Sequence, residues 1–340
     1  MFSKNCDASS NEHDNPNVLI LLTTFKNPPL FAEICSQLKK TDYPNFKIIL
    51  IDYGSTLIRK MLEKQGFSGI LNYIQLTKDP GAAQQLNVGL NEALRYKNIK
   101  YIVRLEGDAV PLGTQWLQVL VNFMDKNDRI AIAMPFDVGN EGKVGYGGRL
   151  YGNCTQSPIT NSASEFVQCI GTGGHCYITR TEYIRELLRA GLTPYWSPFN
   201  ISSEDLDFNL KAWLRGYGVV TVGLARVHHE GTSIAKDGSY RAPYRIYNMY
   251  KNRICLLLLN FGTAHIIVNI WYRFLHDLSS AIVYSEFVPL IKGYLWVIKN
   301  LKKVILERNL RMSRWKRIRD SKLKEIVLIR LPMPIRKLLR

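Results

Sequence analysis

The sequence predicts an α/β protein whose mostly parallel sheet is flanked by helices. Apolar runs of strand length alternate with helical patterns over roughly the first 105 residues, and polar residues follow the ends of several runs. This strand-helix order is typical of a parallel sheet. The 340 residues, 46% hydrophobic and 21% charged, suffice for one large domain with an appendage and exclude a disordered or collagen-like protein.

The first half of the chain supplies the elements of this sheet. Short apolar runs predict four buried strands: Val18–Leu22, Phe46–Ile51, Ile70–Leu76 and Tyr101–Leu105. Helical spacing and start signals predict three connecting helices: one begun by Pro28-Pro29, one over residues 56–65 and one over Gly81–Arg95. Because ligands bind outside the carboxyl ends of such strands, the residues that follow each strand are the candidates for a site.

Further elements follow a stretch rich in Gly, Asn and Ser, residues 136–165, which predicts long loops. The pattern then predicts a strand, two helices and two strands: Phe166–Ile170, Thr181–Ala190, 202–215, Val219–Val222 and Ala225–Val227. We expect residues 1–16, which are polar and lack a signal peptide, to form a loose tail. The six cysteines form no CxxC pair, so we expect mostly reduced thiols of a cytosolic protein.

Positive charge is concentrated at the C-terminal end of the chain. Residues 292–340 hold 16 Lys/Arg against 3 Asp/Glu, whereas the whole chain has a net charge of +17. Apolar and aromatic residues interleave with these charges, which favours an interfacial helix on an anionic membrane surface over a nucleic-acid arm. The alternative is a helix that packs on its own body and leaves a solvated basic face.

A second segment also concerns the membrane. Ile254–Tyr272 contains no Asp, Glu, Lys or Arg over 19 residues, which is near the length needed to span a bilayer. Its polar residues would be costly in lipid. We therefore favour two helices, broken near Asn260–Gly262 and lying on or near the membrane, over a span across 254–272.

Polar side chains follow three of the predicted strands. They are Thr23-Thr24, Asp52 and the pair Glu106 and Asp108. The turn at Gly107 would let both carboxylates of the pair approach one ion. Hard oxygen ligands suit Mg²⁺ or Mn²⁺, and such an ion would bind a substrate diphosphate.

Two downstream segments also carry titratable groups. Glu204-Asp205 opens a predicted helix, where acids complement the dipole and Ser202 resembles a capping residue, but where a general base is equally consistent. His228-His229 follows a strand and could supply a metal ligand or merely a packed, hydrogen-bonded ring. The spacing of Cys169, His175 and Cys176 is not that of a structural zinc site.

Read in order, these segments resemble an inverting family 2 glycosyltransferase with a GT-A, Rossmann-like fold, of the rhamnosyltransferase-like subgroup. The resemblance covers roughly residues 17–260 and rests on their order and spacing. The segments that carry it are Thr23 to Lys26, Ile51 to Thr56, Asp79-Pro80-Gly81 with Asn87, Glu106-Gly107-Asp108 at the DxD position, Ile170 to Thr179, Ser203 to Phe208, and His228 to Ser233. This sequence departs from the family pattern at Asp79, Leu86 and Glu106.

The resemblance implies a role for individual residues. For donor binding it implies Thr24, Phe25, Asp52, Gly81, Asn87, Glu106, Gly107 and Asp108. For a Mn²⁺ or Mg²⁺ ion it implies Asp108 and Glu106 with His228, and for the acceptor side Gly173, Gly174 and His175. It implies that Asp205, next to Glu204, is the catalytic base.

The expected function is therefore metal-dependent, inverting transfer of a hexosyl or deoxyhexosyl group from a UDP- or dTDP-type sugar. The acceptor would be a hydroxyl of a glycan or lipid-linked glycan. We expect a tail (1–16), a GT-A catalytic domain (17–241) and basic amphipathic helices (242–340) that hold the enzyme at the inner face of the cell membrane. The alternatives are a catalytically inactive partner subunit and a nucleic-acid-binding protein acting through its tail.

Overall fold

The computed structural model of the chain describes residues 17–26, 30–55, 57–64, 70–139, 144–145, 147–159, 164–171, 174–230, 242–319 and 327–328. The predicted tail (1–16), Pro28-Pro29, Gly173 and Cys6 lie outside the described residues. Cys35, Cys154, Cys169, Cys176 and Cys255 are buried free thiols, which agrees with the expectation of reduced cysteines.

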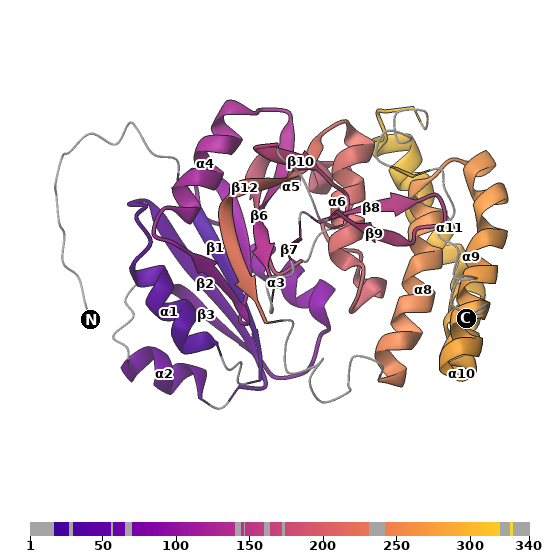
Figure 1. The fold of residues 1–340 in the computed structure, drawn as a ribbon, viewed down its shortest axis with the longest axis horizontal. Helices are drawn as coiled ribbons and strands as arrows, with labels where there is room; N and C mark the ends of the chain where they lie inside the picture. The colour runs from indigo at the N-terminus through magenta and orange to yellow at the C-terminus, as the bar shows by residue number, and fades with distance from the viewer. Residues whose placement is uncertain are drawn as a thin grey trace.

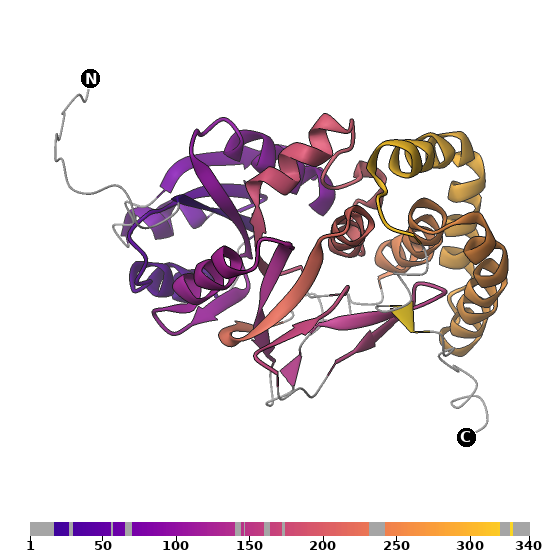
Figure 2. The same ribbon diagram turned by 90° about the horizontal axis from the view of Figure 1, so that it is seen from above.

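A central mixed sheet forms the middle layer of the molecule (Figures 1 and 2). Its strands lie in the order β10-β12-β6-β11-β4-β1-β2-β3. The predicted parallel half comprises β1 (Asn17–Phe25), β2 (Phe46–Tyr53), β3 (Ile70–Leu76) and β4 (Ile99–Glu106). The other half comprises β6 (Ile130–Val138), β10 (Phe166–Gln168), β11 (Cys176–Arg180) and β12 (Gly218–His229). β11 runs antiparallel between β4 and β6, and β5 (Ala109–Leu112) pairs with β12.

The sheet is buried on both faces because alternate residues of its strands face opposite helical layers. Leu19 and Leu21 of β1 belong to one core cluster, and Val18 and Ile20 belong to the other. The helices that cover the sheet are α1 (Phe31–Lys39), α2 (Ile58–Lys64), α3 (Ala82–Ala93), α4 (Trp116–Lys126), α5 (Thr181–Arg189) and α6 (Glu204–Arg215). The predicted α/β class is confirmed.

Two stretches differ in detail from the expectation. The two strands predicted over residues 219–227 are one long strand, β12, whose pairing with β6 is irregular between Val222 and Arg226. The stretch 136–165, predicted as loops, holds short strands in its described parts: β7 (Val144–Gly145), β8 (Gly148–Tyr151) and β9 (Gln156–Pro158). β8 and β9 form a separate small sheet with β13 (Val327–Leu328).

Helices follow β12 in the chain and lie at the right of Figure 1. They are α8 (Pro243–Asn260), α9 (Thr263–Tyr284), α10 (Phe287–Lys299), α11 (Leu301–Leu310) and a short π-helix, η4 (Arg311–Trp315). The predicted break near Asn260–Gly262 is confirmed, since α8 ends and α9 begins there. Among the described helices, none combines the length and apolar character that crossing a bilayer requires. Leu256, Leu257 and Trp315 join one of the two main cores, so these helices pack directly on the sheet domain.

Candidate functional site at the carboxyl edge of the sheet

Backbone pairing brings the ends of four strands together. Thr23 at the end of β1 is in register with Glu106 at the end of β4, and the Gly107 amide donates to the Thr23 carbonyl oxygen at 2.8 Å. The Glu106 amide donates to the carbonyl oxygen of His175, which directly precedes β11, at 2.8 Å. His229, the last residue of β12, is in register with Ala109 of β5. The predicted convergence of polar strand ends therefore extends to strands far apart in the sequence.

The acidic pair after β4 forms a cluster with a histidine. Ligand-type atoms of Glu106, Asp108 and His229 lie within 4.8 Å of one another. His229 Nε2 is 3.3 Å from Asp108 Oδ2. Burial by itself lowers the pKa of His229, but the neighbouring carboxylates, Asp108 above all, outweigh it and raise that pKa above its ordinary value.

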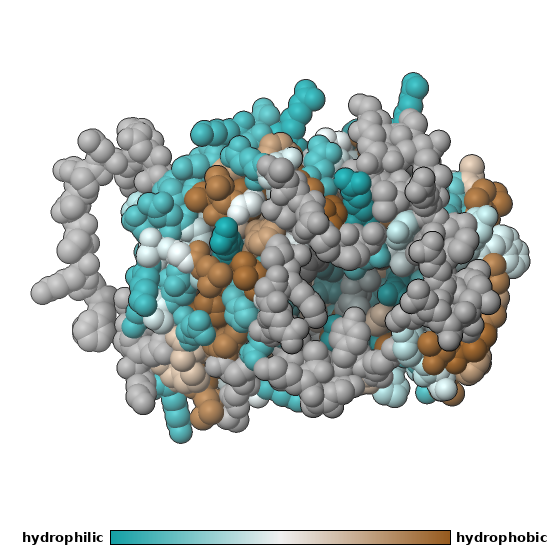
Figure 3. Space-filling view, in the orientation of Figure 1, coloured by the Kyte–Doolittle hydropathy of each residue, from teal (hydrophilic) through white to brown (hydrophobic). Residues whose placement is uncertain are grey.

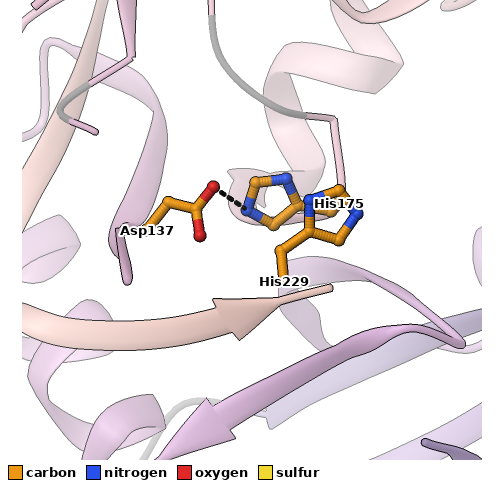
Figure 4. Close-up of side chains that lie close together, drawn as sticks. All are labelled: Asp137, His175 and His229. Carbon is orange, nitrogen blue, oxygen red and sulfur yellow. Dashed lines mark ion pairs between the residues drawn. The ribbon is translucent and has the colours of Figure 1, made fainter. Parts of the chain in front are cut away.

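A second group shares the same histidine. Asp137, His175 and His229 also offer ligand atoms within 4.8 Å of one another, and Figure 4 shows the Asp137 carboxylate directed at the paired rings. The two imidazoles stack with centroids 4.1 Å apart, and His175 Nε2 lies 3.7 Å from Asp137 Oδ2. Burial, helped by His229 and Arg104, holds the pKa of His175 well below its ordinary value, so this ring is neutral.

The donor set of these two groups fits a divalent cation. It consists of carboxylate oxygens and imidazole nitrogens, and a neutral imidazole such as His175 has a lone pair for a metal. Asp137 Oδ1 and His175 Nδ1 are buried and have no hydrogen-bond partner among the described residues. Buried polar atoms without partners are costly, and an ion at this edge would satisfy such atoms.

His228 and His229 differ in what they contact. The metal ligand expected from the family resemblance was His228, but His228 Nδ1 lies 3.0 Å from the Val138 carbonyl oxygen, and His228 belongs to neither group. Adjacent residues of a strand point to opposite faces, so only one of the two can face the acids. In this structure that residue is His229.

A second pair of acids adjoins this edge through Arg104, a buried residue of β4. Its guanidinium pairs with Glu106, and Nη2 also lies 3.6 Å from Glu204 Oε1 at the start of α6. A Cβ atom on Gly174 would lie 2.7 Å from Arg104 Nη1 and 3.0 Å from Asp205 Cβ. The absence of a side chain at Gly174 therefore lets the start of α6 approach the end of β4.

The pKa values of both acids at the start of α6 are raised. Burial, together with its neighbour Asp205, raises the pKa of Glu204 to about 7 although Arg104 opposes the shift. Burial likewise raises the pKa of Asp205. The N-cap of α6 is Ser203, one residue after the predicted Ser202, and its side chain makes no capping hydrogen bond. A carboxyl group with a raised pKa at this edge of the sheet is suited to proton transfer.

The ends of β1 and β2 form the other side of the site. Asp52 is fully buried, and its carboxylate accepts hydrogen bonds from Thr24 Oγ1 at 2.8 Å and from the Tyr73 hydroxyl at 3.0 Å. Burial raises the pKa of Asp52. Phe25 is exposed and its ring lies 5.6 Å from that of Tyr53. Asp52 thus orients Thr24 and Tyr73, while Phe25 keeps an exposed ring with Lys26 Nζ 5.2 Å from its centroid.

Gly81 and Asn87 have structural partners. Gly81 precedes α3 with a φ of +73°, and a Cβ there would lie 1.4 Å from Asn200 Oδ1. Both polar atoms of the Asn87 amide bond the backbone of Tyr195, at 2.7 and 3.1 Å. These contacts hold α3 against the segment before α6. Neither Gly81 nor Asn87 belongs to the two groups of acids and histidines.

Some residues of the site carry no sequence signal that we recognised. Asp137 lies at the end of β6 and Arg104 within β4, and Tyr73 lies in the middle of β3. Asp137 could have been found as another carboxylate that follows an apolar strand. Arg104 and Tyr73 could not, because a polar residue inside a strand shows its role only once its partners on other strands are placed.

A parallel half-sheet with acids, histidines and a nearby acid pair at its carboxyl edge is typical of α/β proteins that bind ligands at the carboxyl ends of their strands. The chain belongs to glycosyl transferase family 2: the family model matches residues 19–188, half of the chain. A search of curated proteins gave no match.

Two solved structures share the fold. The crystal structure of GalNAc-T7 with UDP, GalNAc and Mn²⁺ is similar with a TM-score of 0.59 at 14% identity, over 89% of this chain and 59% of that chain. The crystal structure of S. aureus TarS 1–349 has a TM-score of 0.50 at 14% identity, over 92% of this chain and 83% of that chain. This chain therefore spans little more than half of the GalNAc-T7 chain, and the shared feature is the GT-A-like fold.

Proposed function

We propose that this chain transfers a sugar from a nucleotide diphosphate donor to an acceptor hydroxyl, with inversion at the anomeric carbon. Family 2 membership and a fold shared with a structure that holds UDP and Mn²⁺ support this proposal. The observation that carries it is that Arg104 joins two acidic groups. Its guanidinium pairs with Glu106 and lies 3.6 Å from Glu204, next to Asp205, at the edge that also holds Asp108 and His229.

The residues at this edge have distinct roles in the proposed reaction. Asp108 and His229, with Glu106 shared with Arg104, would hold Mn²⁺ or Mg²⁺. A bound ion of this kind supplies neutralising charge for a diphosphate leaving group. Thr24 and the exposed ring of Phe25 would line the base and ribose side of the donor, and Asp52 would keep Thr24 in place.

Asp205 would act as the general base. Its carboxylate takes the proton of an acceptor hydroxyl, the hydroxyl oxygen forms a bond to the anomeric carbon, and the bond from that carbon to the diphosphate oxygen breaks. Because the hydroxyl attacks opposite the leaving group, the configuration inverts. General base catalysis of this type contributes about 10²–10⁴-fold. Gly174, which lies against Asp205, and its neighbour His175 would border the acceptor.

The finer features remain part of this proposal. They are a UDP- or dTDP-type donor, a hexosyl or deoxyhexosyl group, a glycan or lipid-linked glycan acceptor and the rhamnosyltransferase-like subgroup. The expectation that Gly173 lies on the acceptor side concerns a residue outside the described ranges.

Calorimetric titration tests the donor side. UDP, dTDP and GDP are titrated into the 340-residue chain with and without Mn²⁺. We expect one nucleotide to bind in a metal-dependent way, and His229→Ala to weaken that binding by about 10–100-fold, the range typical of lost metal-site support. His228→Ala is the matched control and keeps the affinity. Absence of binding by all three nucleotides in Mn²⁺ would refute the proposed function.

A further inference from the structure

On α9 the charged side chains are buried and many apolar side chains are exposed, the reverse of the usual pattern on a surface helix. Its only Asp, Glu, Lys or Arg residues are Arg273 and Asp277, and both are fully buried. They pair with each other, and Arg273 also donates to Thr155 Oγ1 at 2.9 Å beside β9. The charged stripe of α9 therefore faces the protein, which leaves its apolar stripe outward.

The apolar stripe of α9 continues onto the next helix. Large hydrophobic side chains are exposed along both helices, and we call this surface the outer apolar face: Ile267, Val268, Trp271, Leu275 and Ile282 of α9, with Phe287, Val288, Ile291, Leu295 and Ile298 of α10. In Figure 3 apolar surface gathers at the right-hand end of the molecule, where Figure 1 places these helices. A contiguous apolar surface of this kind marks an interaction site.

The charges around the outer apolar face are almost all positive. Lys292, Lys299, Lys302 and Lys303 are exposed on α10 and α11. Residues 254–319, all described, contain three acidic residues, and each is engaged inside the protein. Asp277 pairs with Arg273, Glu286 accepts from the Tyr250 hydroxyl at 2.9 Å, and Glu307 pairs with Arg311.

We propose that the outer apolar face inserts into the surface of an anionic lipid bilayer, with the lysines of α10 and α11 at the headgroups. Apolar burial and attraction to anionic lipids act together in such contacts. Trp271 and Tyr272, both exposed, have the amphipathic rings that suit the boundary between headgroups and acyl chains. A second copy of the chain is a poorer occupant, because it would bring uncompensated lysines to both sides of the interface.

The proposed contact is more specific than the one expected from the sequence. The sequence predicts membrane association for the whole of residues 242–340 and for helices on either side of Asn260–Gly262, whereas the proposal assigns insertion to α9 and α10 and gives the lysines an assisting role. It does not depend on the proposed transferase reaction, since it rests on other residues and its test needs no nucleotide.

Vesicle flotation with the full chain tests the proposal. Vesicles of phosphatidylcholine with phosphatidylglycerol are compared with vesicles of phosphatidylcholine alone. We expect the chain to float with the anionic vesicles, and Trp271→Glu/Ile298→Glu to reduce the floated fraction about tenfold. Leu224→Glu is the matched control, because Leu224 on β12 is 69% exposed, as Trp271 is, but lies on a different part of the fold.

A second pair of variants separates the charge contribution from the apolar one. Lys292→Glu/Lys299→Glu should lower binding to anionic vesicles severalfold, while Lys40→Glu/Lys60→Glu, with the same change in net charge on the opposite end of the molecule, should leave it nearly unchanged. All four lysines are exposed, so these variants should fold.

Three results would overturn the proposal. The chain could fail to float with anionic vesicles, or Leu224→Glu could lose binding as strongly as Trp271→Glu/Ile298→Glu. Sedimentation velocity without lipid could also show a dimer that Trp271→Glu/Ile298→Glu dissociates, which would assign the face to a second copy. Circular dichroism of each variant checks that a loss of flotation is not a loss of fold.

Discussion

The first turn of α6 carries acids in two opposite environments. Glu204 and Asp205 share a single buried cation, Arg104, with Glu106, and their pKa values are raised. Asp207 lies two residues further on and is fully buried, yet the Arg311 guanidinium and Lys211 overcome the effect of burial and lower its pKa to about 2. Burial alone therefore does not decide the charge of a carboxyl group; the number of cations for each carboxylate does.

The two environments correspond to two different roles. Glu204 and Asp205 belong to the candidate site, whereas Asp207 belongs to a structural cluster of ion pairs. Asp207 Oδ2 accepts from Lys211 Nζ at 2.8 Å and from Arg311 Nη2 at 3.0 Å, and Asn260 donates to Oδ1 at 3.3 Å. Asp207 is thus fully paired and holds α6 to α8 and η4. Asp205 is partly exposed and shares its one cation with two other acids, which suits its proposed role as the base.

The largest effect should come from Asp205→Asn. We expect kcat for sugar transfer to fall about 10²–10⁴-fold because the proposed base is lost. Metal-dependent nucleotide binding, measured by calorimetry on the same sample, should stay within a few-fold of the wild type. Turnover close to that of the wild-type chain would show that Asp205 is not the base.

Breaking the paired cluster should instead lower stability. Arg311→Met leaves Asp207 with only Lys211 as a charged partner in a buried site, and we expect a loss of about 3–5 kcal/mol in the free energy of unfolding. Urea denaturation measures it. Arg314→Met in the same short helix, at an exposed position, should change stability by less than about 0.5 kcal/mol. Equal stability of the two variants would contradict the supporting role of Arg311.

The pH dependence of stability should distinguish the two environments. A raised pKa means that folded Glu204 keeps a proton that the unfolded chain has lost, so its contribution makes stability fall as pH rises from about 4.5 to about 7. Asp207 has the opposite sign: it adds stability as pH rises from about 2 to 3.8. Glu204→Gln, denatured in urea without added metal, should flatten the first slope. An unchanged slope would mean that Glu204 is already charged at pH 5.

The smallest effect concerns a single hydrogen bond of the supporting cluster. Trp315 Nε1 donates to the Lys211 carbonyl oxygen at 2.7 Å. Trp315→Phe keeps most of the ring and removes the donor, so we expect a loss of about 1–2 kcal/mol. Trp271→Phe, at an exposed position, is the control for the change of ring. A Trp315→Phe variant as stable as this control would show that water or another donor replaces the bond.

The order of elements could be predicted because it rests on local patterns. The apolar runs were sufficient to predict β1 to β4, and the helical spacing was sufficient to predict α3. The polar residues near Asn260 were sufficient to predict the break between α8 and α9. β11 was not among the predicted strands, and nothing within Cys176–Arg180 indicates that such a strand would pair antiparallel with β4. The choice of strand partners depends on residues far away in the sequence.

The charged residues were the least predictable part. Arg273 and Asp277, four residues apart, have the spacing of an exposed ion pair on a helix, yet both are buried. Arg311 belongs to a run of basic residues, which favours a solvated or lipid-facing stretch, and its partner Asp207 lies 104 residues earlier. A sequence shows how many charges a segment has, but not which of them finds a counter-charge inside the fold.

The link between Asp207 and Arg311 also bears on how the chain folds. During synthesis from the N-terminus, the sheet, α6 and its acids emerge long before Arg311 does. Until then Asp207 has Lys211 but lacks its second cation, so the nascent chain cannot complete the core around α6. A contact of such long range closes late and slows folding. Chains released before residue 311 should therefore stay partly open and be prone to proteolysis.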